Sequence, residues 1–378
     1  MKLLGQFLAL SLALPALASN IYITHYDGHV YALALDKDGD ALKLTEKQAL
    51  KTCGAMPSWL TLQEESKILW CTDENTPGTL TPLQIGRNGS IKALAEVTTP
   101  PGGVNSAIYP AGNKTFLAVA HYGNASISSF EIPFTGNKTI EPAHVHRFNL
   151  SPHGPKPGQE QPRPHQVFLD PKKEYIIAPD LGSDRIRIMK IDKKDGRLNQ
   201  CGEILYPAGV GPRQGVFMDD GSKLYTVSEL EGYLCRHDIA YTDSCLGVKG
   251  AGICDVPYTN RTLPKGATLS GIQGVGSTIH VSIRNDTQEG GSIATLHTDG
   301  KAIGPVKLTG SGGSIPRTFV VNKQGTMLAV ANQASSNVVV FARDPKTGQV
   351  GKKLAELKVG KEGKVGAAEG ISSIVWAE

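Results

Sequence analysis

Apolar strands recur along the chain in a fixed order, separated by polar turns. Each unit consists of a Pro or small residue, an apolar strand, a turn rich in Gly, Asp and Lys, a second apolar strand that ends in a polar residue, and a third strand. The units start near six positions: Pro57, Asn105, Pro164, Pro212, Ser270 and Pro316. These starts lie 46 to 59 residues apart, a period typical of the blades of a β-propeller.

A short fourth strand follows in each unit, as at Cys201–Tyr206 and Leu354–Val359. Four strands make one propeller blade. The helix-like segment ALKLTEKQALK at 41–51 lies where another fourth strand is expected, and the sequence leaves its state open.

The two ends of the chain supply the parts of a seventh unit. Gly370–Trp376 has the pattern of a first strand, and Tyr22–Leu35 has that of the second and third strands. Strands from both termini would then share one blade and close the ring without a long exposed sheet edge. We therefore predict an all-β fold: a single seven-bladed β-propeller domain with four-stranded blades, from about Asn20 to Glu378. An array of β-sandwiches is the alternative, but it would not divide one repeat between the two termini.

The first 18 residues have the pattern of a secretory signal peptide. Lys2 precedes an apolar stretch that begins at Leu3, and small residues stand at Ala16 and Ala18. A membrane anchor is disfavoured because the apolar stretch is short and contains Pro15. We predict that residues 1–18 are removed and that the protein is secreted, with cell-wall association as a further option.

Two residue types agree with export. Asn-x-Ser/Thr acceptor sites for N-glycosylation occur at seven positions: Asn88, Asn113, Asn124, Asn137, Asn149, Asn260 and Asn285. The cysteines form an even set: Cys53, Cys71, Cys201, Cys235, Cys245 and Cys254. Up to three disulfides are therefore expected. Proximity in sequence favours Cys53 with Cys71, and a pair within Cys235, Cys245 and Cys254.

Composition and motifs exclude several classes of function. Lys and Arg number 39 against 35 Asp and Glu, with no long basic run, so a nucleic-acid partner is not expected. GxSxG, CxxC and P-loop motifs are absent. His144, His146 and His153 precede a Pro/Gly-rich stretch that we interpret as a surface loop, and we predict neither a metal site nor a cofactor.

The repeats indicate where a binding site would form. In a propeller, equivalent positions of the inner strands converge on the central channel. Charged residues follow the initial Pro in three units: His165, Arg213 and Arg317. The end of the second strand carries polar residues, with Arg284 one place further on: Asp73, His121, Asp180, Glu229 and Asn332. Arginines suit binding of carboxylate or phosphate, and His or Glu can move a proton. The alternative is a polar channel in which these groups only satisfy one another.

Three segments carry a resemblance to a known family. RPHQVFLDP with PDLGSDRIR, GPRQGVFMDDGSKLYTVSEL, and IPRTFVVNKQGTMLAVANQASSNVVVF resemble the lactonase-type seven-bladed propellers, which include fungal 3-carboxy-cis,cis-muconate cyclase and bacterial 6-phosphogluconolactonases. For the cyclase, the resemblance implies a catalytic set of His165, Arg213, Glu229 and Arg284. The other ring positions are expected to bind substrate: Arg317, His121, Asp180 and Asn332.

The resemblance implies a cofactor-independent cycloisomerase that converts a carboxymuconate to a muconolactone. Its partner would be a small polycarboxylate or lactone. Two other functions stay open. One is a lactone hydrolase of the 6-phosphogluconolactonase type. The other is a secreted or cell-surface glycoprotein that uses the propeller to bind extracellular or cell-wall ligands without turnover.

Overall fold

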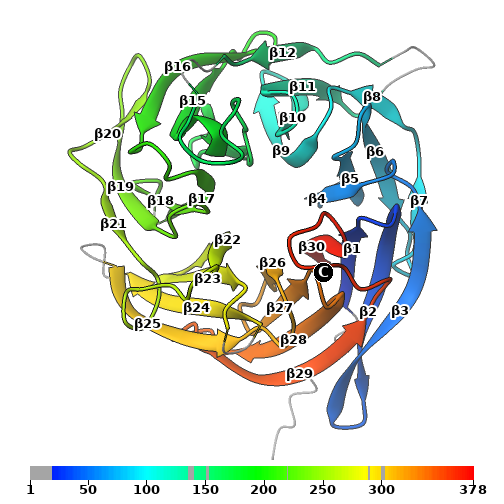
Figure 1. Cartoon of the computed structure of the whole chain (residues 1–378). Helices are drawn as coiled ribbons and strands as arrows, with labels where there is room; N and C mark the ends of the chain where they lie inside the picture. Colours follow the sequence, from blue (N-terminus) through cyan, green and yellow to red (C-terminus); the bar gives the residue numbers. More distant parts are fainter. Residues whose placement is uncertain (1–18, 135–139, 150–152, 219, 288–289, 299–302) are drawn as a thin grey trace, which may run out of the picture.

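The computed structural model describes residues 19–134, 140–149, 153–218, 220–287, 290–298 and 303–378, which form seven antiparallel sheets around a central axis (Figure 1). The predicted seven-bladed, all-β propeller is confirmed. The described residues contain no α-helix and only a short 3-10 turn at Leu181–Ser183. The expected signal peptide at 1–18 and the acceptor Asn137 lie outside the described residues.

The strands of each blade follow one another outward from the axis. The first blade in chain order contains β4 (Pro57–Gln63), β5 (Ile68–Asp73), β6 (Gly78–Ile85), β7 (Ile91–Ala93) and β8 (Val97–Thr99). The second contains β9 (Gly103–Ala111), β10 (Lys114–His121), β11 (Ser126–Ile132) and β12 (His144–Arg147). The third contains β13 (Phe168–Leu169), β14 (Tyr175–Asp180), β15 (Arg185–Ile191) and β16 (Leu198–Leu205).

The next three blades repeat this order. The fourth contains β17 (Pro212–Met218), β18 (Lys223–Ser228), β19 (Leu234–Tyr241), β20 (Leu246–Val248) and β21 (Ile253–Asp255). The fifth contains β22 (Thr268–Val275), β23 (Thr278–Arg284), β24 (Gly291–Thr298) and β25 (Ile303–Gly310). The sixth contains β26 (Pro316–Val321), β27 (Met327–Asn332), β28 (Asn337–Arg343) and β29 (Val350–Lys358).

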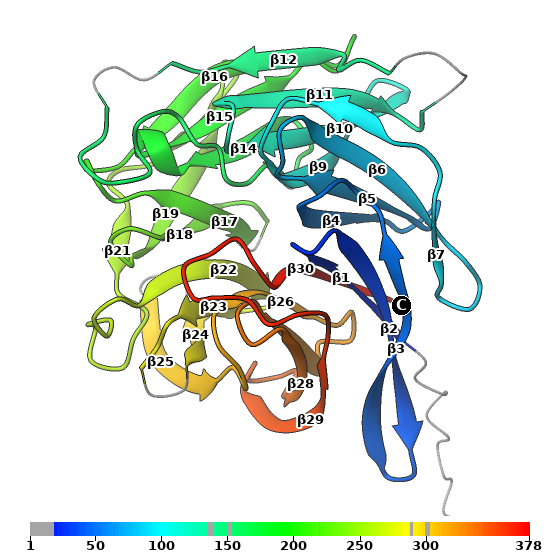
Figure 2. The ribbon, with the colours of Figure 1, turned by 45° about the vertical axis from the view of Figure 1, so that its right-hand side comes forward.

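Both ends of the chain build the seventh blade. The strand β30 (Ile371–Ala377) lies innermost and pairs with β1 (Ser19–His25), followed outward by β2 (His29–Asp38) and β3 (Ala41–Lys51). Both views of the molecule show blue and red strands side by side in this blade (Figures 1 and 2). The predicted closure of the ring by the two termini is therefore confirmed, and the segment 41–51 is a strand.

The second strand of a blade is buried on both of its faces because neighbouring blades cover it. All six residues of β5, β14 and β27 are buried, which explains their nearly continuous apolar sequences. One core cluster, for example, joins Ile21 and Leu33 of the seventh blade with Val338 and Val340 of the sixth. Packing between blades thus holds the second strands in place, and residues at the ends of these strands contribute to the site described below.

The disulfides include one pairing that sequence proximity did not indicate. Cys53 pairs with Cys71, as predicted, and Cys235 pairs with Cys254. Cys245, however, pairs with Cys201, 44 residues away. Cys201 lies on β16 and Cys245 just before β20, so this bond joins two blades. The predicted pair within Cys235, Cys245 and Cys254 is thus confirmed as Cys235–Cys254, and adjacent blades bring the two remaining cysteines together.

No helix among the described residues is long and apolar enough to cross a membrane.

Candidate active site

β-Bulges on the innermost strands position the charged residues that follow the initial Pro. Pairing of β17 with β18 shifts between Pro212 and Gln214, so Arg213 is the extra residue. Pairing of β26 with β27 shifts in the same way around Arg317. A bulge bends the strand and re-aims its side chain. His165 occupies the matching place, next to the bridge between Pro164 and Asp180.

A second ring of side chains lies one residue beyond the second strands. The amide N–H of each of these residues donates to a carbonyl at the entry of the innermost strand, at six matching places: Tyr26 to Gly370, Glu74 to Met56, Tyr122 to Gly102, Leu181 to Arg163, Glu229 to Gly211, and Gln333 to Ile315. Glu229 therefore matches Glu74 and Tyr122, and it lies one residue further along than Asp73 or His121. Successive side chains on a strand point to opposite sides, so this difference of one residue separates the ring from the blade interior.

Three residues expected to bind substrate have other partners in the structure. Nε2 of His121, a fully buried residue, lies 2.7 Å from Ser128 Oγ. Asp180 forms a buried ion pair of 2.7 Å with Arg187. Asn332 is also fully buried and donates to the carbonyl of Ser311. These side chains hold their own blades together, which corrects their expected placement in the site.

The four residues of the expected catalytic set do come together. Glu229 Oε2 lies 2.6 Å from Nε of Arg213, and Glu229 Oε1 lies 2.8 Å from a terminal nitrogen of Arg284. Arg213 also donates to the carbonyl of Ser270 at 2.9 Å. The side chains of Arg213, Arg284 and Glu229 are 2 %, 13 % and 23 % exposed. One carboxylate thus bridges two arginines from adjacent blades and leaves part of its surface open.

The bridge fixes the charge of Glu229. Burial alone would raise the pKa of this carboxyl group, but Arg284 and Arg213 outweigh it and lower the pKa to about 2. Glu229 is therefore an anion across the whole physiological range. A carboxylate with so low a pKa is a poor proton donor or acceptor at neutral pH, so Glu229 is better suited to orient the guanidinium groups of Arg213 and Arg284.

His165 is the group suited to proton transfer. It is 8 % exposed, and its ring meets Tyr122 edge to face at 5.5 Å between centroids. Burial first, then the charges of Arg213 and Arg317, lowers the pKa of His165 well below 6.5. Among the described residues, its Nδ1 has no hydrogen-bond partner. The neutral ring therefore has a free nitrogen at neutral pH.

A cavity of about 360 Å³ opens onto this cluster. Its lining includes five residues of the two rings, together with Arg284 at the end of β23: Tyr26, Glu74, Glu229, Arg317 and Gln333. Tyr26 and Glu74 were missed by sequence reasoning, and the hydroxyl of Tyr26 donates to Glu74 at 2.6 Å. Counting the ring from Glu229 instead of Asp73 would have found both. Arg213 contacts the lining residue Glu229, and the charges of Arg213, Glu229 and Arg317 act on His165.

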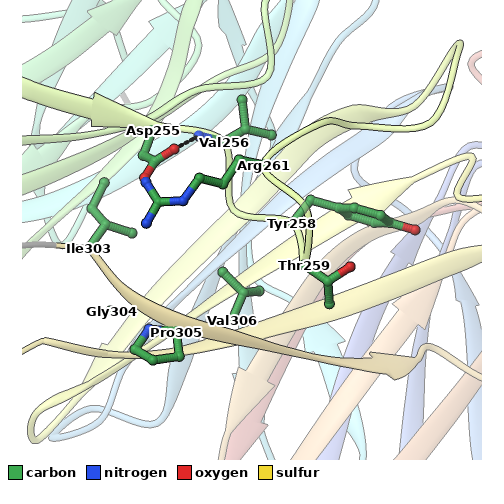
Figure 3. Close-up of a pocket in the computed structure, with 9 residues that line it drawn as sticks. All are labelled: Asp255, Val256, Tyr258, Thr259, Arg261, Ile303, Gly304, Pro305 and Val306. Carbon is green, nitrogen blue, oxygen red and sulfur yellow. Dashed lines mark hydrogen bonds and ion pairs between the residues drawn. The ribbon is translucent and has the colours of Figure 1, made fainter.

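A second cavity, of about 420 Å³, lies at the outer side of the ring (Figure 3). It is formed by 255–261 and by the outermost strand β25, and Arg261 already pairs with Asp255 there. It brings together no histidine and no set of inner-strand residues. In the part of the chain that the structure describes, no group of three His, Cys, Asp or Glu residues could hold a metal ion.

The expected acceptor sites lie at the surface with one difference between them. Five described acceptors are exposed: Asn88, Asn113, Asn149, Asn260 and Asn285. Asn124 is half-buried and accepts a hydrogen bond from Arg147 at 2.8 Å. Asn285 lines the cavity of the channel, so a glycan there would stand at its entrance.

A closed ring of seven blades with a charged cavity lined by inner-strand residues defines the class of this protein as a seven-bladed β-propeller. The sequence matches the model of the family "Lactonase, 7-bladed beta-propeller" over residues 20–366, and the chain belongs to this family.

The chain is similar to several proteins of known or assigned activity. It is 29 % identical over 314 residues to a probable 6-phosphogluconolactonase of Arthroderma benhamiae, covering 79 % of this chain and 76 % of the relative. It is 23 % identical over 332 residues to the 6-phosphogluconolactonase of Bacillus subtilis, covering 85 % and 89 %. The fold matches that of the periplasmic gluconolactonase PpgL of Pseudomonas aeruginosa with a TM-score of 0.77 at 22 % identity, covering 95 % and 99 %.

Proposed function

We propose that the protein hydrolyses a sugar lactone of the 6-phosphogluconolactone type. The observation that supports this proposal is the carboxylate of Glu229, which bridges Arg213 and Arg284 close to the neutral His165. This cluster lies at the cavity of a propeller of the lactonase family. The names of the similar proteins favour hydrolysis over cyclisation of a carboxymuconate. The hydrolase alternative is thus better supported than the cycloisomerase that the sequence led us to expect first.

Each group would have a distinct part in hydrolysis. His165 accepts a proton from a water molecule, whose oxygen attacks the lactone carbonyl carbon. Arg284 lines the cavity and stabilises the oxyanion that forms. The ring C–O bond then breaks, and the protonated His165 returns its proton to the departing ring oxygen. Glu229 stays ionised throughout and holds the arginines in place.

We also propose that the protein is exported. Three disulfides are typical of proteins that fold in an oxidising compartment, so we propose a secreted or periplasm-like location. The expected cell-wall ligands gain no support from the relatives, and a small lactone is the partner that the site supports.

The test compares two reactions on one purified protein. Lactone opening is followed by proton release from 6-phosphogluconolactone and from glucono-δ-lactone, above the spontaneous rate. Cyclisation is followed by loss of the diene absorbance of 3-carboxy-cis,cis-muconate. We expect lactone opening that falls by about 100-fold or more in His165→Ala, since a general base contributes that much.

His297→Ala is the matched control, because His297 is an exposed histidine on β24 outside the cavity. Diene loss without lactone opening would replace the proposal by the cycloisomerase. Silence in both reactions would favour the binding glycoprotein.

A further inference from the structure

The segment that closes the ring also builds one wall of the channel cavity. Residues 359–370 connect β29 to β30 and run beside the central axis (Figures 1 and 2). Five of them line the cavity: Lys364, Val365, Gly366, Ala367 and Ala368. The rest of the lining comes from the inner strands, strand ends and entry loops of the blades, so this wall distinguishes one side of the site from the rest.

The wall is fastened to the sixth blade. Gln333 Nε2 donates to the carbonyl of Ala367 at 3.1 Å, and the amide of Gly363 donates to Ala334 at 2.9 Å. Gly370 has φ +81°, and any side chain there would collide with the carbonyl of Gln333. These contacts flank Lys364 on both sides, so its backbone has a defined place at the cavity.

The charges that line the cavity are not balanced. Glu74 accepts the hydrogen bond of Tyr26, and Glu229 is bridged by two arginines. Among the described residues, neither Arg317 nor Lys364 has a carboxylate within the 4.0 Å of an ion pair. Arg317 instead lies with its guanidinium 5.5 Å from the centroid of the Tyr26 ring. Three cations, Arg284, Arg317 and Lys364, thus line the cavity against two carboxylates, Glu74 and Glu229, which leaves an excess of positive charge.

We propose that Arg317 and Lys364 bind an anionic group of the substrate, a phosphate or a carboxylate, away from the lactone carbonyl. Lys364 is then the specificity-determining residue that separates charged sugar lactones from neutral ones. This inference rests on the proposed function, since it assigns the substrate class of the same site. An ammonium group binds phosphate or carboxylate as a point charge, and Arg317 adds planar donors.

The effect of Lys364 is expected to be moderate. Lys364 is exposed, so water and salt screen its charge, whereas Arg317 is half-buried. A charge-assisted hydrogen bond of this kind changes affinity by about tenfold. The preference for an anionic lactone is expected to shrink as salt is raised from 0.05 to about 0.5 M.

The experiment measures kcat/KM of the wild type and of Lys364→Gln on three lactones: 6-phosphogluconolactone, a sugar lactone with a carboxylate at carbon 6, and neutral glucono-δ-lactone. We expect Lys364→Gln to lower kcat/KM about tenfold for the anionic lactones, mainly through KM, and to change the neutral lactone by less than about twofold. The anionic lactone whose kcat/KM falls more shows whether the site binds a phosphate or a carboxylate. Lys361→Gln removes the same charge from the same segment but outside this cavity, and it is expected to change neither.

Equal losses on charged and neutral lactones, or a wild type without preference for the anion, would overturn the assignment. Calorimetric binding of glucose 6-phosphate and of neutral glucose gives a readout without turnover. Tighter binding of glucose 6-phosphate that Lys364→Gln removes would support the anion site even if no lactone is opened, in which case only the proposed hydrolysis fails. Equal binding of both sugars would refute the anion site itself.

Discussion

Arg213 is a nearly fully buried cation, and Glu229 is the carboxylate that neutralises it. This pair therefore affects folding as well as chemistry, because an uncompensated buried charge is strongly destabilising. Its surface neighbour Glu231 pairs with Lys156 in a far more exposed place. The two glutamates differ in burial and not in chemical type, which makes them a useful comparison.

Glu229→Gln is expected to lower the free energy of unfolding by about 3 kcal/mol at pH 7, since it leaves Arg213 without a counter-charge. Glu231→Gln should cost less than about 0.5 kcal/mol. Denaturant unfolding at several pH values measures both. Because the folded-state pKa of Glu229 is lowered from 4.5 to about 2, its contribution is fully present above pH 4.5 and is lost as the pH falls toward 2. A similar loss of unfolding free energy in both variants would contradict the role of Glu229 as the counter-charge of Arg213.

The acid side of the activity profile depends on His165. Its pKa is well below 6.5 because of burial and then the charge of Arg213, so the ring stays neutral in mildly acidic solution. We expect kcat/KM for lactone opening to stay constant from pH 7.5 through 6.5 and to fall only at lower pH. Initial rates in weakly buffered solution check this. A half-loss of activity near pH 6.5 would show that the base is an ordinary histidine.

At the scale of the strands, bulges and disulfides bring residues to positions that the alternation of side chains along a strand does not predict. The bulge at Arg317 on β26 brings this side chain to the cavity. The disulfide between Cys201 and Cys245 joins the third blade to the fourth, whereas Cys235 and Cys254 join paired strands of one blade. The first disulfide therefore constrains how blades pack, and the second constrains a local connection.

Replacing both Cys201 and Cys245 by Ser is expected to lower the free energy of unfolding by about 4 kcal/mol, because the bond closes a loop with a separation of 44 residues. Replacing Cys235 and Cys254, which are 19 apart, should cost about 3 kcal/mol. Guanidinium unfolding under non-reducing conditions measures both losses. Finding the larger loss for the shorter loop would argue against the loop-entropy explanation.

At the scale of the whole molecule, the ring depends on the last strand of the chain. β30 is the innermost strand of the seventh blade, and its Ile371 and Ile374 belong to the core shared with the sixth blade. It also holds the end of the wall that carries Lys364. Closure of the ring and construction of the site are therefore coupled.

Deleting residues 371–378 is expected to abolish cooperative unfolding and cause aggregation, because it exposes the edge of β1 and opens the core. Thermal unfolding by circular dichroism and size-exclusion chromatography test this. A circular permutant that joins residue 378 to residue 19 through a short Gly-Ser linker, opened in the exposed linker at 207–208, keeps every strand pair. It should unfold cooperatively, and a well-folded deletion variant would contradict the role of β30.

The sequence by itself determined the seven blades and their shared terminal blade, because the buried second strands repeat an almost unbroken apolar pattern. The set of His165, Arg213, Glu229 and Arg284 came from the family resemblance, and its catalytic role stays a prediction. The outer strands were harder to predict: 41–51 forms β3, although the sequence left a helix open there, and β12 at His144–Arg147 was not anticipated. Outer strands such as β3 are mostly exposed, so burial imposes little pattern on them.

Only the tertiary structure decided which polar residues face the channel and which cysteines pair across blades. His121 and Glu229 both end second strands in the sequence, yet pairing with the innermost strand places them one residue apart and on opposite sides. A single-residue shift cannot be read from a repeat of 46 to 59 residues with irregular turns. Tyr26 and Glu74 follow once the repeat is counted from Glu229, but only the strand pairing shows that this is the position to count from. Lys364 lies in the connection that closes the ring, and the tertiary structure alone brings it to the same cavity.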